Sequence, residues 1–308
     1  MKKIALLLAS VALAVLLAST AAVLTAEPGV GQTSAVTLVG AGDIASCKSK
    51  GDTATAKLLA NIPGTVLAIG DNAYQEGTLW QFNNCYDPTW GTYKSRTKPV
   101  VGNHEYRTSG ASGYFNYFGA AAGESGKGYY SYNRGAWHIV ALNSECKYWA
   151  TGFKDGPSRC SSQKQADMIA WLKADLAANP TRCTLAYFHQ PRFSSGYGSN
   201  ALETQPIWNA LYAARADVVL SGHDHIYERF ARQTPKGTQS NRGIRQITVG
   251  TGGVNHGGIG TIKANSQVRN TSAYGVLKLR LRSTDYSWKF VPEAGKTFTD
   301  SGTTSCSI

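Results

Sequence analysis

The sequence has six cysteines but no Cys-x-x-Cys pair, so neither a thiolate zinc site nor a thioredoxin-like motif is indicated. Beyond the N-terminus, no apolar run is long enough to cross a bilayer. No dense cluster of Lys and Arg marks a nucleic-acid-binding arm, and we expect no specific nucleic-acid binding. No low-complexity linker divides the chain. We therefore expect one large α/β domain over residues 35–300, followed by an irregular tail at 301–308.

The N-terminus has the pattern of a signal peptide. Lys2 and Lys3 precede an apolar run at 4–17, and small residues follow it, so we expect a signal peptide over 1–26. An uncleaved membrane anchor is the alternative, because the run approaches spanning length. Removal of the segment would place the protein outside the cell or in the cell envelope.

Cysteine usage agrees with export, because an even number of cysteines behind a signal peptide favours disulfides. Sequence proximity makes Cys146–Cys160 the first expected pair. The other two expected pairs are Cys47–Cys85 and Cys183–Cys306.

Acidic residues are scarce, with 19 Asp and Glu against 31 Lys and Arg, which gives a net charge of +12. Loss of Lys2 and Lys3 with the signal peptide lowers it to +10. A basic surface attracts anionic partners, which include phosphate esters and anionic cell-surface polymers. The alternative is an exported protein that simply carries an excess of Lys and Arg.

Polar residues of metal-ligand type follow several β-like apolar runs. The runs are 35–39, 65–69, 99–101, 184–188 and 217–220, and the residues that follow them are Asp43, Asp71, Asn103, His189, His223 and His225. Because ligands of α/β folds gather at the carboxyl ends of strands, we expect these residues at one edge of a sheet. Sets of oxygen and imidazole donors suit first-row metals, so the pattern predicts a site for two metal ions. A single Gly-Asp after a strand is usually only a turn, and the inference depends on the joint pattern.

Helical periodicity is present at 53–61, 162–178 and 204–214. Strand-like alternation returns at 244–249, 273–281 and 286–291, which we expect to complete a second sheet.

The ordered motifs resemble the calcineurin-like metallophosphoesterases. They are Gly42-Asp43, Gly70-Asp71, Gly102-Asn103-His104-Glu105, His189 and Gly222-His223-Asp224-His225. Two details resemble the purple-acid-phosphatase branch: Ala45 stands where other branches carry a histidine, and Tyr74 follows Asp71 by three residues. The resemblance implies an α/β (α+β) fold, a four-layer α-β-β-α sandwich with two central mixed sheets. A separate N-terminal β-sandwich domain is not expected, because only about 16 residues lie between Ala26 and Asp43.

The resemblance also implies the ligands of each metal. Metal one would be held by Asp43, Asp71, Tyr74 and His225, and metal two by Asp71, Asn103, His189 and His223. Tyr74 as a hard phenolate favours a trivalent ion, so iron with zinc, manganese or a second iron is expected. A buried aromatic without a metal role is the alternative for Tyr74.

The activity implied is hydrolysis of phosphate monoesters by attack of a metal-bound hydroxide, with His104 assisting the leaving group beside Asp71 and Asn103. A packing histidine is the alternative for His104. The closest rival activity is that of a phosphodiesterase or nucleotidase with the same metals. A rival from another class is a non-catalytic surface protein that binds anionic polymers.

One departure concerns the substrate side. The branch commonly carries another histidine several residues beyond the equivalent of His189, and residues 190–198 contain none. Arg192 as a fork of donors, Tyr197 as a hydroxyl and His256 on a glycine-rich loop are the candidate substrate contacts. The alternatives are a surface arginine and an exposed loop histidine, while His138 is expected to be structural.

Overall fold

The computed structural model describes residues 35–147, 162–197 and 200–307. The predicted signal peptide and the side chains of the predicted Cys146–Cys160 pair lie outside the described part of the chain. Within that part, no helix is both long and apolar enough to span a membrane.

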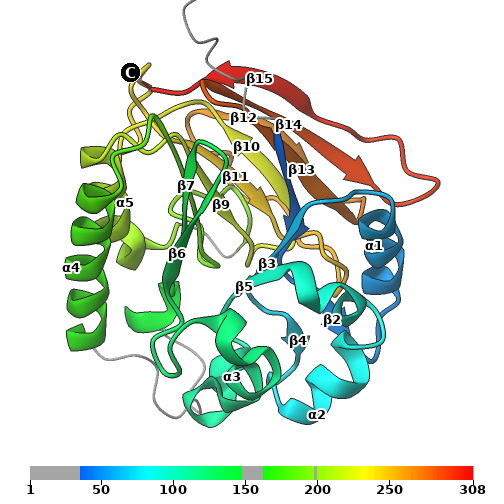
Figure 1. Cartoon of the computed structure of the whole chain (residues 1–308). Coiled ribbons are helices and arrows are strands. Elements are labelled where there is room, and N and C mark those ends of the chain that lie inside the picture. Colours follow the sequence, from blue (N-terminus) through cyan, green and yellow to red (C-terminus); the bar gives the residue numbers. More distant parts are fainter. Residues whose placement is uncertain (1–34, 148–161, 198–199, 308) are drawn as a thin grey trace, which may run out of the picture. The chain divides into compact units, whose positions relative to one another are not determined.

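Two mixed sheets form the centre of the domain (Figure 1). The first sheet has the strand order β15-β14-β13-β1-β3-β5. Its strands are β1 (Val36–Ala41), β3 (Thr65–Ile69), β5 (Thr97–Val100), β13 (Gly275–Leu281), β14 (Asp285–Pro292) and β15 (Ser301–Ser305). β1, β3 and β5 run parallel, and β13 to β15 are antiparallel to their neighbours.

The second sheet has the strand order β12-β10-β11-β9-β8-β7-β6. Its strands are β6 (Tyr130–Arg134), β7 (Trp137–Ala141), β8 (Cys183–Tyr187), β9 (Val218–Ser221), β10 (Tyr227–Phe230), β11 (Arg245–Val249) and β12 (Ser266–Asn270). β7, β8, β9 and β11 are parallel.

The described helices are α1 (Gly51–Ala60), α2 (Leu79–Gln81), α3 (Ser112–Phe118), α4 (Ser162–Ala178) and α5 (Gln205–Ala213). Short 3-10 and π-helical segments are η1 (Phe82–Tyr86), η2 (Trp90–Arg96), η3 (Glu105–Arg107), η4 (Ser109–Ala111), η5 (Gly119–Ala122), η6 (Ser144–Lys147) and η7 (Leu202–Thr204). A small parallel sheet joins β2 (Ala45–Ser46) to β4 (Ala73–Tyr74).

Alternate residues of the second sheet enter two separate cores, which explains why its strands are continuously apolar. Ile139 and Leu185 face the first sheet and pack in one core with residues such as Leu279. Val140 and Ala186 face the opposite way, into a core with α4 and α5. A sheet that is covered on both faces favours such runs.

The layers therefore follow the order α4 and α5, second sheet, first sheet, α1 (Figure 1). α1 buries Ala56 and Leu59, which belong to the same continuous cluster of buried apolar residues as the strands of the first sheet. The expected α/β fold with two mixed sheets is confirmed.

Two expectations about the C-terminal part were wrong. β13 and β14 extend the first sheet, and only β11 of the three expected strands joins the second. Ser301–Ser305 is not irregular but forms β15, because its backbone pairs with β14 from Lys289 to Asp285. Cys306 then forms a disulfide with Cys183 at the start of β8, which fixes this end of the chain. The Cys47–Cys85 disulfide is also present, as expected.

Candidate metal centre

The seven residues predicted to bind metal lie in one cluster beyond the carboxyl ends of the parallel strands. Asp43 follows β1, Asp71 follows β3, and Tyr74 ends β4. Asn103 follows β5, His189 follows β8, and His223 and His225 follow β9. The carboxyl ends of the two sheets thus deliver their loops to a common site.

The first group of donors surrounds the hydroxyl of Tyr74. Its oxygen lies 2.9 Å from Oδ1 of Asp43, 3.0 Å from Oδ2 of Asp71 and 3.1 Å from Nε2 of His225. Asp43 and His225 are 3.2 Å apart. One hydroxyl proton cannot satisfy all of these neighbours, and a set that contains two carboxylates and a phenol is suited to a cation.

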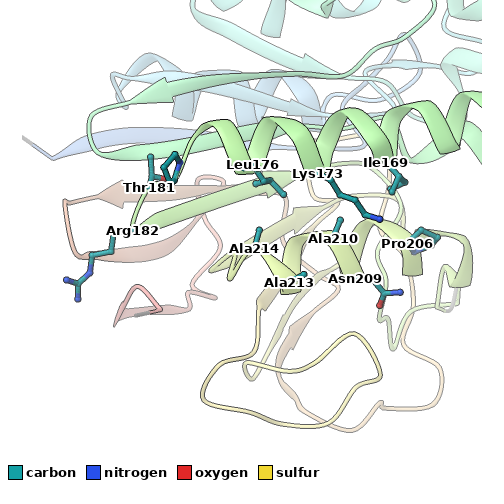
Figure 2. A pocket seen from close by; sticks show the side chains of 12 residues that line it. Ile169, Lys173, Leu176, Thr181, Arg182, Pro206, Asn209, Ala210, Ala213 and Ala214 are labelled. Atoms are coloured by element: carbon teal, nitrogen blue, oxygen red, sulfur yellow. The ribbon is translucent and has the colours of Figure 1, made fainter.

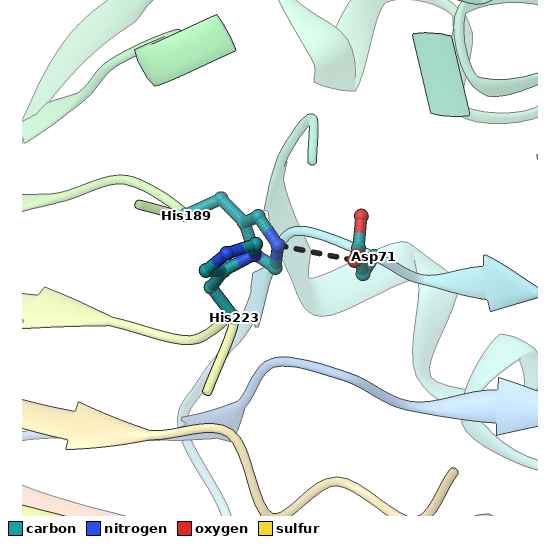
Figure 3. A group of neighbouring side chains, drawn as sticks. All are labelled: Asp71, His189 and His223. Carbon is teal, nitrogen blue, oxygen red and sulfur yellow. Dashed lines mark ion pairs between the residues drawn. The ribbon is translucent and has the colours of Figure 1, made fainter. Parts of the chain in front are cut away.

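The second group of donors shares Asp71 with the first. Oδ2 of Asp71 lies 3.1 Å from Nε2 of His189 (Figure 3). Ligand atoms of Asp71, His189 and His223 all lie within 4.8 Å of one another. Nδ1 of His223 is 3.0 Å from Oδ1 of Asn103, so the amide oxygen of Asn103 faces the same group.

The orientation of His189 fits a metal ligand. Its Nδ1 lies 2.9 Å from the carbonyl oxygen of Ile69, so this nitrogen carries the proton and donates it. Nε2 is fully buried and has no hydrogen-bond partner, and it faces the Asp71 carboxylate. A lone pair facing a carboxylate oxygen requires a proton or a cation in between. Donation of the second imidazole nitrogen to a backbone carbonyl is the usual arrangement of histidine ligands.

Electrostatics within the cluster are consistent with a cation. Burial, together with the charges of Asp43 and Asp71, raises the pKa of the Tyr74 phenol well above its ordinary value. Burial alone would raise the pKa of Asp71, but the charge of His189 outweighs it and lowers that pKa. Burial and the neighbouring His189 lower the pKa of His223 to about 4. Burial would lower the pKa of His189, but the charges of Asp71 and Asp43 outweigh it and raise that pKa well above its ordinary value. The two buried carboxylates therefore favour a positive charge beside them.

Four of these residues occupy left-handed backbone conformations. The φ angles are 60° at Asp43, 48° at Asp71, 74° at His223 and 48° at His225. Such conformations cost about 1–3 kcal/mol each outside glycine and cluster at functional sites. The described chain has only three other non-glycine residues with positive φ, so this strain is concentrated at the cluster.

The glycines that precede the ligands permit the close approach of the loops. Gly70 has a φ of +75°, and a Cβ atom there would lie 2.5 Å from Nδ1 of His189. A Cβ atom on Gly102 would collide with Oδ1 and the backbone nitrogen of Asp71. A side chain at either position would push a ligand out of the cluster.

Glu105 shapes the site although the sequence reasoning gave it no role. Its Oε1 accepts hydrogen bonds from the backbone N–H groups of Asn72 at 2.7 Å and Ala73 at 3.2 Å. Its Oε2 accepts those of Asp71 at 3.0 Å and Gly102 at 2.8 Å. Burial and the Asp71 charge raise the pKa of Glu105 to about 8. The hydrogen bonds from the backbone N–H groups act in the opposite direction and limit this rise. The one signal in the sequence was its place beside Asn103-His104.

His104 lies at the edge of the cluster. Its backbone N–H donates to Oδ1 of Asp71 at 2.8 Å, and Nδ1 of its ring lies 2.7 Å from the carbonyl oxygen of Gln75. Its Nε2 is 3.8 Å from Oδ2 of Asp71, and the ring packs 4.2 Å from that of Tyr74. Nδ1 donates to Gln75, so Nε2 is the nitrogen turned to the cluster.

Of the three predicted substrate contacts, one is buried and two lie on the surface at the glycine-rich loop. Arg192 is buried and directs its guanidinium to Gln205. Tyr197 is 79% exposed and lies against the glycine-rich loop at Gly258. His256 is exposed on that loop, with its ring stacked 4.0 Å from Tyr274.

The same glycine-rich loop contacts the cluster directly. The side chain of Asn255 hydrogen-bonds to His225, and Gly257 donates its backbone N–H to the carbonyl of His225 at 2.9 Å. Tyr197 and His256 therefore lie on the His225 side of the candidate centre, whereas the contacts of Arg192 lead to α5.

His138 has structural partners, as expected. Its ring bridges Asn133 and Asp175, each at 2.8 Å, on the side of the second sheet that faces α4. A groove of about 870 Å³ between α4 and α5 (Figure 2) is lined by none of the predicted site residues.

Comparison with known proteins gives a consistent family assignment. Residues 37–227 match the family described as calcineurin-like phosphoesterase. Purple acid phosphatase 23 of Arabidopsis thaliana is 30% identical over 235 residues, which are 64% of this chain and 48% of that protein. Purple acid phosphatase 15 of the same plant is 29% identical, over 57% of this chain and 37% of that protein. This chain thus spans half or less of the length of these two relatives.

Solved structures show the same fold. Purple acid phosphatase PPD1 from yellow lupin (Lupinus luteus) seeds aligns with a TM-score of 0.67 and 18% identity, over 89% of this chain and 54% of that one. GAP50, the anchor in the inner membrane complex of Plasmodium, aligns with a TM-score of 0.66 and 18% identity, over 87% and 88% of the two chains. At this identity the likeness concerns the fold alone.

Proposed function

The chain belongs to the calcineurin-like phosphoesterase family, and from this premise we propose that it hydrolyses phosphate monoesters at a centre of two metal ions. Its similarity to two purple acid phosphatases supports the choice of reaction. The donor atoms at the strand ends support the choice of a metal centre.

The observation that carries the proposal is the position of one oxygen atom. Oδ2 of Asp71 lies 3.0 Å from the Tyr74 hydroxyl and 3.1 Å from Nε2 of His189, so it belongs to both donor groups. A carboxylate at this place is suited to contact a cation in each donor group. Each of the other donors belongs to one group only.

In the proposed arrangement the two donor groups hold one metal each. Asp43, Asp71, Tyr74 and His225 would hold the first metal, and the phenol oxygen makes this group of donors suitable for iron(III). Asp71, Asn103, His189 and His223 would hold the second, which has two fewer anionic donors once the phenol is ionised and therefore suits a divalent zinc, manganese or iron. When bound, such a pair activates a water molecule near neutral pH and binds the phosphate oxygens.

The chain's own residues orient the substrate and move the proton. His104 is held by Gln75 with Nε2 toward the cluster, in a position to protonate the leaving oxygen. Tyr197 and His256 line the approach on the His225 side and are the proposed contacts for the rest of the substrate. Arg192 would need a rearrangement of its contact with Gln205 to take part.

We also propose that the protein works outside the cytoplasm. The Cys47–Cys85 and Cys183–Cys306 disulfides support this location, because such bonds persist in oxidising compartments.

The test is hydrolysis of a matched aryl phosphate monoester and diester before and after chelation. Asn103→Ala removes a proposed ligand, and Asn84→Ala changes an exposed asparagine as the control. We expect chelator-sensitive monoester cleavage that Asn103→Ala abolishes and Asn84→Ala leaves intact. A preference for the diester would replace the proposal by a phosphodiesterase. No cleavage by fully metal-loaded protein would favour a non-catalytic binding protein.

A further inference from the structure

A hollow of about 490 Å³ lies at the amino ends of β1, β3 and β5. The four charged residues in its lining are all cationic: Lys94, Arg96, Lys98 and Arg134. Several are held in place, since Arg96 donates to the carbonyls of Leu59, Ile62 and Gly64 at the end of α1. Lys98 and Arg134 lie over the same aromatic ring, that of Tyr132, at 5.4 and 5.8 Å.

A second hollow, of about 330 Å³, lies on β13, β14 and β15. Lys278, Arg280 and Lys289 line it together with the hydroxyl-bearing residues Ser287, Ser301 and Thr303. The strand register places Lys278, Lys289 and Ser301 in one row across the three strands. The adjacent row contains Arg280, Ser287 and Thr303.

The two hollows meet at one cross-strand pair. Thr37 of β1 lines the first hollow, Arg280 of β13 lines the second, and the two residues are directly opposite in the antiparallel ladder. Directly opposite residues project from the same face of a sheet. The four cations of the first hollow and the three of the second therefore form one continuous surface, the cationic band. Among the described residues that line it there is no carboxylate.

The pairing of Lys278 with Lys289 is unfavourable for the isolated protein. Like charges directly opposite each other in an antiparallel sheet are destabilising, whereas opposite charges stabilise it. Within the described chain, no ion pair engages Lys278, Lys289 or Arg280. A bound anion would remove the repulsion, so the pair points to a ligand.

From this charge distribution we propose that the cationic band is a docking surface for a linear phosphodiester polymer that carries no aromatic bases. Lysines act as point charges for phosphate, and the Ser and Thr hydroxyls of the two rows are further donors. The two joined hollows suit an extended polymer, which contacts successive cations along the band.

The lack of exposed aromatic rings among the described residues that line the band favours such a polymer over single-stranded nucleic acid. Trp288 lines the second hollow, but it is buried and its Nε1 donates to Asp300. Proteins that bind single strands combine cations with aromatic rings on which bases stack. The large apolar side chains that are exposed in the described chain, Leu79, Trp80, Tyr197, Leu202 and Ile262, all lie outside the band. Tyr132 is only half-exposed and is already covered by Lys98 and Arg134.

The first hollow of the band lies at the opposite end of the strands from the candidate metal centre. Thr37 and Thr65 lie near the start of the parallel strands that Asp43 and Asp71 follow, while the second hollow lies on the antiparallel strands β13, β14 and β15. A five-residue strand such as β3 spans about 17 Å. Docking on the band therefore leaves the metal centre free, and it holds whatever activity that centre has close to the polymer.

The test is binding of fluorescently labelled poly(glycerol phosphate) to the folded protein, measured by anisotropy over a range of salt concentrations. The band variant carries Lys278→Gln, Arg280→Gln and Lys289→Gln. The control variant carries the same charge change at exposed residues outside the band: Lys173→Gln, Lys236→Gln and Arg242→Gln. We expect the band variant to bind at least about tenfold more weakly at low salt, with a salt slope lower by about two to three. The control should change affinity by less than about threefold.

Equal losses in both variants would overturn the proposal, because net charge alone would then explain the binding. So would tighter binding of a single-stranded oligonucleotide or of anionic lipid vesicles with the same dependence on the band. Thermal unfolding should show that the band variant is folded, since it removes a repulsive pair. Hydrolysis of a small aryl phosphate should be the same in all three proteins, so this result does not depend on the proposed reaction.

Discussion

The carboxylate of Glu105 accepts the backbone N–H of Asp71 at 3.0 Å, while the backbone N–H of the adjacent His104 donates to the Asp71 side chain at 2.8 Å. The Glu105 side chain also binds Asn72, Ala73 and Gly102. The loops after β3 and β5 are thereby joined by one buried side chain.

Glu105→Gln should impair metal binding. A glutamine amide turns two N–H groups toward backbone donors, so at least two of the four hydrogen bonds are lost. We expect about tenfold to a hundredfold weaker metal affinity, measured on the folded protein below its unfolding transition, and a loss of about 2–5 kcal/mol of stability, measured by urea unfolding. Glu228→Gln is the matched control: Glu228 is buried and accepts from Ser195 and Ser266, so it should lower stability only. Normal metal affinity in Glu105→Gln would contradict the positioning role.

Tyr74→Phe should abolish any visible absorption of iron-loaded protein. The phenol of Tyr74 has a pKa raised well above its ordinary value by burial and two carboxylates, so only a bound metal ionises it. We expect a tyrosinate-to-iron band in the parent and none in Tyr74→Phe. Tyr106→Phe is the control, because the Tyr106 hydroxyl binds Asn143 instead. If the absorption band persists in Tyr74→Phe, the absorption comes from a ligand other than Tyr74.

His104→Ala should lower turnover without loss of metal. General acid catalysis contributes about 10²–10⁴-fold, and the loss should be greater for alkyl phosphates than for aryl phosphates with good leaving groups. His138→Ala, which removes the partner of Asp175 away from the centre, should leave kcat unchanged. Metal analysis of the purified variants completes the measurement. Loss of metal together with activity would make His104 a ligand or a packing residue.

Strand ends were predictable because the signal is local. β3 covers the apolar run at 65–69, so Asp71 lies just beyond a strand end as expected, and α4 covers the periodic segment at 162–178. The approach of Asp43 to His225 depended on more, because β1 and β9 belong to different sheets that bring their carboxyl ends to a common site.

Hydrogen-bond partners from distant loops, and the choice of which strands pair, were not predictable from the sequence. The role of Glu105 needs four N–H groups from two loops that are about 30 residues apart in sequence. The alternation of β13 and β14 indicates strands but does not say which sheet they join. β15 has no apolar alternation, since its Ser, Gly and Thr residues lie at a sheet edge, and its structure comes from pairing with β14.

Loss of the Cys183–Cys306 disulfide should destabilise the protein more than loss of Cys47–Cys85. The first pair is separated by 123 residues and the second by 38. In the chain-entropy model the longer loop is worth about 1 kcal/mol more, within a total of about 3–5 kcal/mol. Paired Cys→Ala variants compared by urea unfolding measure the difference. A larger loss from the shorter loop would show that local contacts, not loop entropy, determine the effect.

Asp300 connects the two sheets, and its removal should have a pH-dependent cost. Its carboxylate accepts hydrogen bonds from Tyr227 at 2.7 Å, from Arg229 at 2.7 Å and from Trp288 at 3.1 Å. Burial would raise the pKa of Asp300, but these hydrogen bonds, led by Arg229, outweigh it and lower the pKa. A lowered carboxyl pKa contributes stability above the ordinary value of about 4, and this is lost as the pH falls through the lower folded value.

Asp300→Asn should therefore cost about 1–3 kcal/mol at pH 7, and the difference from the parent should shrink below about pH 4. Asp285→Asn is the control, because Asp285 pairs with Arg282 at the surface and should cost less than about 1 kcal/mol. Urea unfolding at neutral and acidic pH measures both. If the loss of stability in Asp300→Asn stays constant across this pH range, the side chain of Asp300 would connect β10 to β14 by its packing and not by the charge of its carboxylate.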